Sequence, residues 1–329
     1  MTTPEVTVVV PTRNREAVLG VTLRSVLDQH GVDVRVVVVD EASTDGTAAM
    51  LDRLDDRRVH VVRHPEPRGV ATARNTGLAE VGTRWVAFCD DDDVWAPDKL
   101  AAQLTAVEAA PGSRWCCGGS VLVDADLTVV DHQPAVDGDV LDDLLGMNVI
   151  AGGGSGVLAE SSLVREVGAF DEGLRNSEDW DLWIRLAAAS PIAAVHRPLV
   201  GYRIWAASKS RDLGRMESAW STITGRYQEL AADRGVRPDR WRHQAYLARQ
   251  QVRSGRRVAA ARTYGRVARA TGEPRQWVRA ASAFMAPSVM DRIGTGRAAR
   301  AVPTTWRVEA DAWLDDCRRP LTGVLGSPA

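Results

Sequence analysis

Four aspartates stand side by side at residues 90–93, within the stretch FCDDDDVW. Adjacent carboxylates repel one another and resist desolvation, so such a cluster requires compensating positive charge. A hard divalent cation is the simplest source, because Mg²⁺ or Mn²⁺ held by one or two carboxylates completes its shell with water and phosphate oxygens. The cluster therefore predicts a metal–diphosphate site. The alternative is a solvated acidic turn that caps the helix beginning near Pro97, which the bulky neighbours Phe88 and Trp95 disfavour.

Two arginines accompany a second predicted helix start, in the stretch RGVATARN. A helix N-terminus that carries an arginine in its first turn is suited to binding an anion. Arg68 and Arg74 could instead pair with a neighbouring acid at the surface, and this alternative is stronger for Arg68 than for Arg74. We therefore expect Arg74 close to an anionic ligand.

The apolar pattern of the first hundred residues predicts the elements that position these clusters. Continuous apolar runs predict strands, and apolar residues spaced by three and four predict helices between them. Strands that are apolar on both faces and separated by single helices imply a parallel sheet covered on both sides, as in a doubly wound α/β domain. The strands are expected at 6–10, 35–39, 59–62 and 85–89, and the helices at 16–28, 46–54 and 70–81.

Each expected strand is followed by a polar segment. Because the carboxyl ends of parallel strands meet at one edge of a sheet, and open α/β sheets bind ligands there, the four segments predict a common binding site. Any one of them alone would be an ordinary loop, rich in Asp, Gly and Thr because turns and helix caps favour those residues. The segments are PTRNR (11–15), DEASTDG (40–46), RHPEPRG (63–69) and DDDDVWAPD (90–98).

The remainder of the chain divides into a mixed region and a helical one. Between about 100 and 215 we expect a helix at 98–109, short β-like runs, a Gly-rich loop at 151–156 and an amphipathic helix at 177–189. After about 215 the pattern is helical, and Gly255 separates two Arg-rich stretches in the manner of a helical hairpin. The expected domains are therefore 1–215, binding and catalytic, and 216–329, all-helical.

Composition narrows the possible partners. The chain of 329 residues starts without a signal-like segment and holds no uncharged apolar run of the roughly 18 residues that a membrane span needs, so we expect a cytoplasmic protein. Its four cysteines show no metal-ligand spacing and suggest neither a zinc site nor a disulfide framework. Residues 241–300 hold thirteen arginines and no lysine against Glu273 and Asp291.

That basic stretch does not by itself indicate nucleic-acid binding. Lysine occurs only at positions 99 and 209, so arginine is the usual cation of this chain and solvated helix faces explain most of the arginines. Arg256 and Arg257, with the apolar side of the segment 277–290, suggest a peripheral contact with anionic lipid at the inner face of a membrane.

Five blocks of the sequence, in order over roughly residues 5–210, resemble family-two glycosyltransferases. These are inverting enzymes of the GT-A fold that use nucleotide-diphospho sugars. The order of the blocks makes the resemblance far more specific than an isolated acidic triplet. The blocks are VVVPTRNR, VVVVDEASTDGT, RGVATARNTGLAEVGTRWVAFCDDDDVWAPDKL, VGAFDEGLRNSEDWDLWIRLA and PLVGYR.

The resemblance implies a nucleotide pocket at the edge of the sheet. Pro11, Thr12 and Arg13 would line the pocket, Asp40 would contact the base, and Arg74 would lie near the nucleotide. Glu41 replaces the aspartate that relatives carry after Asp40, and its longer arm would alter the contact with the base or ribose.

The resemblance also implies the acids of the reaction. Asp90, Asp91 and Asp92 correspond to the Asp-x-Asp motif, with Asp92 and Asp90 as metal ligands and Asp91 near the ribose. Glu178 and Asp179 would supply the catalytic base, which we assign to Asp179. Inverting transfer needs one carboxylate to take the proton of the acceptor hydroxyl, while the metal stabilises the departing diphosphate. Asp179 is also compatible with an N-cap of the helix at 180–188.

The acceptor side is less well defined by the sequence. Trp95 and Trp205 lie in loops and are candidates for stacking on a sugar, whereas Trp180 and Trp183 are expected in the core. Trp205 also stands where relatives often carry a histidine. This difference would change the contacts that the segment after PLVGYR makes with the metal or the diphosphate. The Gly-rich loop with Gly154 and Ser155 would either receive the acceptor closely or serve only as a flexible connection.

The predicted function is therefore metal-dependent, inverting transfer of a sugar from a nucleotide-diphosphate donor. UDP is the default nucleotide, with GDP and dTDP open, and the acceptor is a glycan, a lipid-linked intermediate or a small molecule. One alternative is an inactive nucleotide-sugar binding or scaffolding protein, which the acids together with Asp179 disfavour. Another is a nucleotidyltransferase, which would require a Gly-rich, Lys-containing phosphate loop where the chain has PTRNR.

Overall fold

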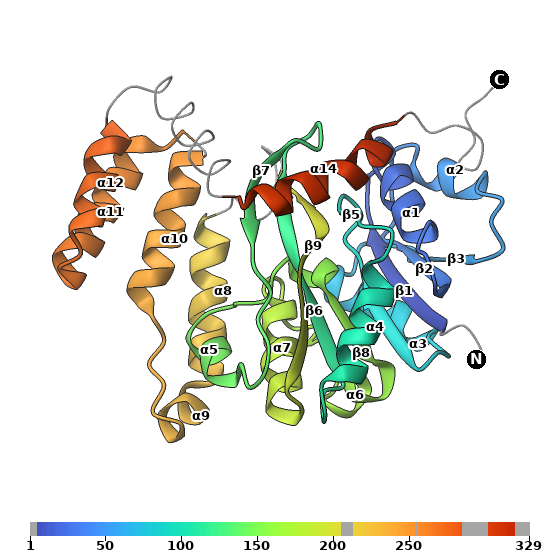
Figure 1. Cartoon of the computed structure of the whole chain (residues 1–329), viewed down its shortest axis with the longest axis horizontal. Helices are drawn as coiled ribbons and strands as arrows, with labels where there is room; N and C mark the ends of the chain where they lie inside the picture. Colours follow the sequence, from blue (N-terminus) through green and yellow to red (C-terminus); the bar gives the residue numbers. More distant parts are fainter. Residues whose placement is uncertain (1–4, 205–212, 254, 285–301, 320–329) are drawn as a thin grey trace. The chain divides into compact units, whose positions relative to one another are not determined.

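The computed structural model describes residues 5–204, 213–253, 255–284 and 302–319 (Figure 1). Contacts divide the chain into two compact units. The α/β unit comprises Met1–Leu141, Val149–Arg203 and Pro303–Ala329, and the helical unit comprises Asp142–Asn148 and Ile204–Val302.

The first half of the sheet in the α/β unit is parallel, as the apolar pattern predicts. Its strands run in the order β3-β2-β1-β4, and every pair among them is parallel. Their four carboxyl ends therefore lie at the same edge. The strands are β1 (Glu5–Thr12), β2 (Asp33–Asp40), β3 (Val59–Arg63) and β4 (Trp85–Phe88), connected by the helices α1 (Leu19–Leu27), α2 (Thr47–Asp52) and α3 (Val70–Ala79).

The second half of the sheet is mixed, a departure from the mostly parallel arrangement that the sequence predicts. β8 (Val157–Glu160) adds antiparallel to β4, and the order continues β8-β6-β9-β5, with β7 also paired to β6. Only β6 and β9 pair in parallel there. The other elements of this half are β5 (Val94–Trp95), α4 (Lys99–Ala109), β6 (Trp115–Val123), β7 (Val129–Gln133), the 3₁₀ turn η1 (Gly153–Gly156), α6 (Ser161–Glu166), α7 (Glu178–Ala189) and β9 (Ile192–Arg203).

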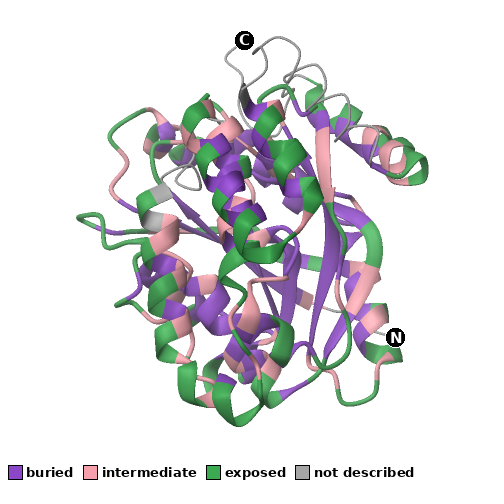
Figure 2. Cartoon of the chain, turned by 90° about the vertical axis from the view of Figure 1, so that its left-hand side faces the viewer, coloured by how far each residue is buried: buried purple, intermediate pink, exposed green. Residues whose placement is uncertain are grey.

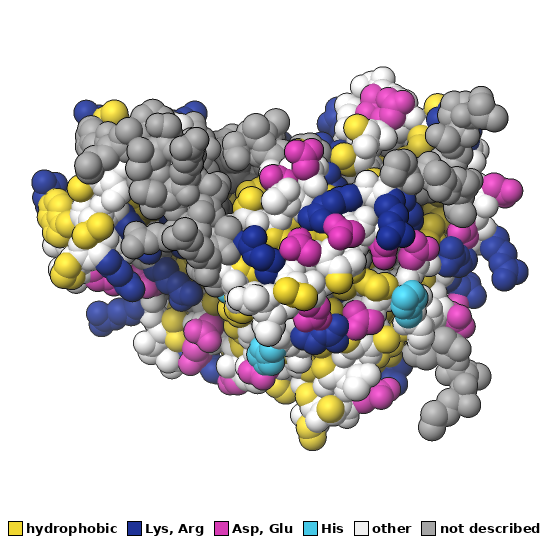
Figure 3. All heavy atoms as spheres, turned by 45° about the horizontal axis from the view of Figure 1, so that its top comes forward, with side chains coloured by type: hydrophobic (Ala, Val, Ile, Leu, Met, Phe, Trp, Pro, Cys, Tyr) yellow, Lys and Arg dark blue, Asp and Glu magenta, His cyan; other side chains and the backbone are white. Residues whose placement is uncertain are grey.

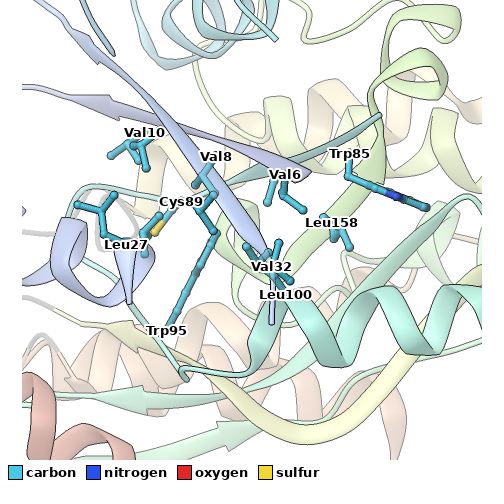
Figure 4. Packing of buried hydrophobic residues seen from close by; sticks show 14 of the residues in the cluster. Val6, Val8, Val10, Leu27, Val32, Trp85, Cys89, Trp95, Leu100 and Leu158 are labelled. Carbon is cyan, nitrogen blue, oxygen red and sulfur yellow. The ribbon is translucent and has the colours of Figure 1, made fainter. Parts of the chain in front are cut away.

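Alternation along the central strands gives the sheet two packed faces. Val6, Val8 and Val10 of β1 belong to one core cluster together with buried residues of α1 and α4, part of which Figure 4 shows. Val9 points the other way, and a Cβ atom on Gly77 of α3 would lie 2.3 Å from it. The central strands are accordingly buried along most of their length in Figure 2. A sheet covered on both faces leaves its edges for binding.

The helix α14 (Thr304–Arg318) belongs to the α/β unit, although it follows the helical unit in the sequence. Arg24 of α1 donates hydrogen bonds of 3.0, 2.9 and 3.1 Å to the carbonyl oxygens of Asp316, Cys317 and Arg319. Trp313 and Leu314 are buried, and both lie against Gly201 of β9. The compact units thus differ from the expected domain 216–329, because the apolar face of α14 packs on the sheet.

Most of the helical unit is an insertion between β9 and α14, and a short segment, Asp142–Asn148, joins it from earlier in the chain. Ala248, Tyr264 and Ala280 join its last three helices in a small core, and Gly255, with φ +73°, connects the predicted hairpin of α10 and α11. Among the described residues, no helix is both long and apolar enough to cross a membrane. The elements are α5 (Leu141–Gly146), which leads in from the α/β unit, α8 (Leu213–Arg226), α9 (Gln228–Asp233), α10 (Arg240–Arg253), α11 (Arg257–Thr271) and α12 (Pro274–Phe284).

Candidate active site

The acidic turn after β4, residues 90–93, is tied to the loop after β1. Asp91 accepts a hydrogen bond of 3.1 Å from the backbone N–H of Arg13 and one of 3.0 Å from Nε of Arg15. The same guanidinium reaches Asp92, with 3.4 Å between Nη2 and Oδ2. The half-exposed Arg15 thus supplies positive charge to two neighbouring carboxylates, which lowers their mutual repulsion.

A second arginine, Arg74 of α3, joins the acidic turn to the start of α7. Its Nη2 donates to Asp90 at 2.7 Å and its Nη1 to Glu178 at 2.8 Å. Arg74 is only 3% exposed, and its guanidinium lies 5.2 Å from the ring centre of Phe170. Burial strengthens both ion pairs, so this side chain fixes the position of one acid relative to the other.

The fourth aspartate, Asp93, is held by hydrogen bonds within the protein. It is fully buried, and its carboxylate accepts hydrogen bonds of 2.6 Å from the Ser155 hydroxyl and 2.9 Å from the Arg203 backbone N–H. Burial, with the nearby charges of Asp92 and Asp90, raises the pKa of the Asp93 carboxyl well above its ordinary value. The four adjacent acids are tolerated because each one accepts a hydrogen bond within the protein, with Arg15 shared by Asp91 and Asp92.

Asp179 lies in the first turn of α7, which begins at Glu178 rather than at residue 180. The residue at the helix N-cap is Ser177, with φ 59°, so the N-cap position expected for Asp179 is wrong. Oδ1 of Asp179 accepts a 2.7 Å hydrogen bond from the backbone N–H of Trp180. Burial and the adjacent charge of Glu178 raise the pKa of Asp179 to about 7, and the guanidinium of Arg74 opposes that rise.

The Gly-rich loop lies close to Asp179 and to the acidic turn. A Cβ atom added to Gly153 would lie 3.7 Å from Oδ2 of Asp179, and one added to Gly154 would lie 2.7 Å from Nη2 of Arg74 and 3.6 Å from Oδ1 of Asp90. A side chain at Gly154 would collide with the Arg74 guanidinium, and one at Gly153 would touch Asp179. The absence of a Cβ at these positions lets the loop backbone lie close to Asp179, Arg74 and Asp90.

The expected nucleotide residues lie at the carboxyl ends of β1 and β2. Pro11 and Thr12 are buried at the end of β1, and Arg13 is exposed. Asp40 is buried at the end of β2, and its Oδ1 accepts a 3.0 Å hydrogen bond from the backbone N–H of Ser43. Nε of Arg63 lies 3.9 Å from its other oxygen.

Glu41 does not face this pocket as the sequence suggests. Its carboxylate pairs with Nδ1 of His64 at 2.7 Å and accepts backbone N–H bonds from Gly69 at 2.6 Å and Arg68 at 3.2 Å. Both oxygens are therefore used within the protein, where they hold the N-terminus of α3. An aspartate arm is one methylene shorter, which is a physical reason for glutamate at this position.

Three of the expected acceptor residues are buried, namely Trp95, Gly154 and Ser155. Trp95 is 1% exposed in β5, and Nζ of Lys99 lies 3.8 Å from the centre of its ring. Ser155 is fully buried and uses its hydroxyl within the chain. A direct sugar contact through either side chain is therefore wrong. Trp205 lies outside the described residues.

The core role of Trp180 and Trp183 is confirmed, since both are buried and Trp183 stacks on Trp115 at 6.1 Å. Two site residues escaped prediction. Arg15 belongs to the quoted PTRNR segment, and Arg203 is the last residue of the PLVGYR block. Nε of Arg203 donates to the Asp92 carbonyl at 2.9 Å. The positive charge of Arg15 and Arg203, and their position within the motifs, could have identified both residues from the sequence.

The donor chemistry of the turn suits a hard cation, because Asp90 and Asp92, two residues apart in the sequence, both offer carboxylate oxygens. Among the residues that the structure describes, no group of three or more His, Cys, Asp or Glu side chains is arranged to hold a metal ion. All four cysteines are buried, and none is in a disulfide bond.

A half-parallel sheet with clustered acids at its carboxyl edge, completed by antiparallel strands, defines the GT-A class of α/β folds. The profile of Glycosyl transferase family 2 matches residues 7–127, which therefore form a domain of that family. This is the family that the sequence blocks resemble.

Curated relatives agree with this assignment. The chain is 43% identical over 103 residues to TuaG of Bacillus subtilis, a glycosyltransferase named for teichuronic acid biosynthesis. It is 32% identical over 100 residues to the UDP-Glc:alpha-D-GlcNAc-diphosphoundecaprenol beta-1,3-glucosyltransferase WfgD of Escherichia coli. These matches cover 31% and 30% of this chain and 41% and 40% of the relatives, so the chain spans less than half of either one.

Solved structures share the fold over nearly the whole chain. Staphylococcus aureus TarS in complex with UDP-GlcNAc has a TM-score of 0.56 at 16% identity, over 95% of this chain and 89% of that one. The mannosyltransferase PcManGT of Pyrobaculum calidifontis, in complex with GDP-Man and Mn²⁺, has a TM-score of 0.51 at 22% identity, over 96% and 86%.

Proposed function

We propose that this protein transfers a sugar from a nucleotide-diphosphate donor to an acceptor hydroxyl, with inversion at the anomeric carbon. One observation carries the proposal. The backbone of Gly153 lies close to Asp179 and that of Gly154 close to Arg74 and Asp90, while Arg74 bridges the acidic turn to Glu178, the neighbour of Asp179. A base held close to a donor site is what a single displacement requires.

Asp90 and Asp92 would hold a divalent cation, either Mn²⁺ or Mg²⁺. Two carboxylates provide part of a shell that water and diphosphate oxygens complete. When bound, the cation would neutralise the charge that develops on the departing diphosphate. Arg15, which already contacts Asp91 and Asp92, would hold the turn and add positive charge beside the same group.

Asp179 would take the proton of the acceptor hydroxyl as its oxygen attacks the anomeric carbon. A pKa of about 7 suits this role, since the group is then a stronger base than an ordinary aspartate and is still ionised in part at neutral pH. Glu178 would act through its charge and through Arg74. An inactive nucleotide-sugar binder has no need for a carboxylate of this kind, which favours the enzyme.

The donor would lie over the ends of β1 and β2, with Asp40 accepting a hydrogen bond from the base. UDP remains our default nucleotide, and the structural neighbours hold UDP-GlcNAc in one case and GDP-Man in the other. For the acceptor, the names of the relatives favour a glycan or a lipid-linked intermediate over a small molecule.

Calorimetric titration with UDP, GDP and dTDP, with and without Mn²⁺, tests the donor site. We expect one nucleotide to bind in a metal-dependent manner, and we expect Asp92→Ala to abolish this binding. Asp137→Ala is a matched control, because its carboxylate is 67% exposed and lies outside the site. If no nucleotide binds under any metal condition, the proposal fails. Nucleotide binding without sugar transfer in any acceptor screen would support the inactive binder instead.

We also propose that the helical unit contacts anionic lipid at the inner face of a membrane. Residues 240–284 hold eleven arginines and a single acid, Glu273. On α12, Trp277 is 46% and Val278 63% exposed, and the guanidinium of Arg269 lies 5.5 Å from the Trp277 ring. Figure 3 shows hydrophobic side chains beside basic ones over α11 and α12. Exposed apolar groups next to arginine favour a lipid interface over nucleic acid.

Co-sedimentation with vesicles tests this contact. Vesicles that contain anionic phosphatidylglycerol should retain the protein at low salt, and neutral phosphatidylcholine vesicles should not. Val278→Ser should weaken retention, whereas Val308→Ser, at a residue 65% exposed on α14, should not. Equal effects of the two substitutions, or binding to RNA but not to vesicles, would contradict the membrane proposal.

A further inference from the structure

The hydroxyl of Ser155 joins both ends of the acidic turn. Its oxygen accepts a 2.9 Å hydrogen bond from the backbone N–H of Asp90, and its proton goes to Oδ2 of Asp93 at 2.6 Å. Ser155 and Asp93 are both fully buried, so water cannot replace either bond. One side chain of the Gly-rich loop thereby sets the position of the turn.

The loop is anchored on its other side by the core. Nε2 of Gln103 donates to the carbonyl oxygens of Gly156 at 2.9 Å and Cys116 at 3.3 Å. Oε1 of Gln103 accepts a 2.8 Å hydrogen bond from the buried Lys99 ammonium group. The C-terminal end of the loop is therefore fixed to α4 and β6, and Ser155 transmits that fixed position to the acids.

The same loop carries two glycines that lie beside Asp179 and Arg74. Gly153 lies next to Asp179, and Gly154 lies next to Arg74 and Asp90. A shift of the loop would change the space on both sides at once. A displaced Ser155 would therefore disturb both the acids of the turn and the surroundings of Asp179.

We propose that Ser155 is a positioning residue that sets the spacing between the donor acids and Asp179. This inference rests on the proposed function and deepens it. Without the hydroxyl, the backbone N–H of Asp90 and the carboxylate of Asp93 would each lose a buried partner. The turn and the glycine backbone would then be free to move relative to one another.

A purely structural role for Ser155 is the competing explanation, and Ser161 provides the control. Ser161 is 5% exposed, and its hydroxyl donates to the carbonyl oxygens of Thr83 at 2.7 Å and Arg84 at 3.1 Å. It is a buried serine with two hydrogen bonds in the same unit, and neither bond reaches the acids. Ser155→Ala and Ser161→Ala should lower the melting temperature by similar amounts.

Nucleotide affinity and turnover separate the two roles. We expect Ser155→Ala to raise the Kd for UDP in the presence of Mn²⁺ about tenfold and to lower kcat at saturating donor by tenfold or more. Ser161→Ala should leave both values within about twofold of the wild type. Ser155→Thr, which keeps a hydroxyl, should recover part of the loss.

Three outcomes are decisive. Selective loss in Ser155→Ala supports the inference. If both alanine variants lose stability but keep wild-type Kd and kcat, the inference is wrong and the proposed function stands. If the wild type binds neither UDP, GDP nor dTDP with Mn²⁺, the proposed function fails and this inference fails with it. Folded fractions measured by circular dichroism normalise all values, so a poorly folded variant is not mistaken for a poor enzyme.

Discussion

Gly154 lies so close to Arg74 that a Cβ atom on the glycine would stand 2.7 Å from Nη2 of the arginine. Real Cβ atoms essentially never approach another heavy atom this closely, so one of the two groups would have to shift. Arg74 cannot move freely, because it is buried between Asp90 and Glu178. The smallest residue is therefore required where the loop passes the buried guanidinium.

Gly154→Ala tests this requirement. We expect kcat/KM for sugar transfer to fall about tenfold or more, because the displaced guanidinium would no longer hold Asp90 and Glu178 together. Gly82→Ala is the matched control, since nothing lies within 4 Å of its added Cβ, and it should change stability by less than about 0.5 kcal/mol. Equal activity in the two variants would show that the site tolerates the methyl group.

Arg74→Met should destabilise the protein by about 3–5 kcal/mol, because it leaves Asp90 and Glu178 near one another without their shared cation. Arg84→Met is the comparison, since Arg84 also pairs with a glutamate, Glu160, but its side chain is 73% exposed. An exposed pair of that kind contributes about 0–1 kcal/mol. Urea unfolding of both variants measures the difference, and similar losses would mean that burial of the Arg74 pairs is unimportant.

The rate of transfer should rise with pH through the pKa of Asp179. The base acts only when ionised, so kcat at saturating donor should increase through about pH 7 and then level off. The Asp179→Asn variant should lose most of its activity, and its remaining kcat should show no such increase with pH. A rate that is flat between pH 5 and 8 in the wild type would rule out Asp179 as the titrating base.

The raised pKa of Asp179 also predicts that folding stability falls as the pH rises, whereas the rate of transfer rises. The folded pKa of Asp179 lies above the unfolded value of about 3.9, so the folded protein binds more protons between these two values. Its contribution to stability is complete below about pH 4 and is lost as the pH rises through 7. The melting temperature of Asp179→Asn relative to the wild type should therefore increase from pH 5 to pH 8, which a thermal melt at each pH would reveal.

Glu41 and Asp40 are neighbours with separable roles. Glu41→Gln should weaken the hold on the N-terminus of α3 and cost about 1–3 kcal/mol of stability, because the charged acceptor of three donors is lost. Asp40→Asn should instead raise the Kd for the nucleotide about tenfold with little change in stability. Thermal melts and calorimetry on both variants check this division, and a nucleotide preference altered by Glu41→Gln alone would reverse it.

The sheet edge could be predicted because its signals are local. Apolar runs at 6–10, 35–39, 59–62 and 85–89 mark strands wherever the rest of the chain lies, and a parallel sheet brings their polar ends to one side. The acids, PTRNR and Asp40 therefore meet at one edge, as expected. The helical hairpin around Gly255 follows from the same kind of local pattern.

Other features depend on contacts between distant residues. Glu41 looks like a pocket residue in the sequence, and only the packing of α3 against β2 directs its carboxylate to Gly69 and His64. The sequence predicts polar loops at Trp95 and Ser155, yet both residues are buried, Trp95 within β5 and Ser155 within η1. A side chain's exposure is a property of its neighbours in space, which a pattern along the chain does not contain.

The last helix shows the same limit at the scale of a domain. In the sequence α14 follows a long helical stretch, so the pattern predicts that it belongs to the same helical domain. In the structure Arg24 binds its terminal carbonyl groups, and Trp313 and Leu314 pack beside Gly201, nearly three hundred and about one hundred residues away in the chain. Local periodicity specifies that a helix forms with one apolar face. Which surface buries that face is decided by the free energy of packing in the folded chain, and that depends on all the surfaces available at once.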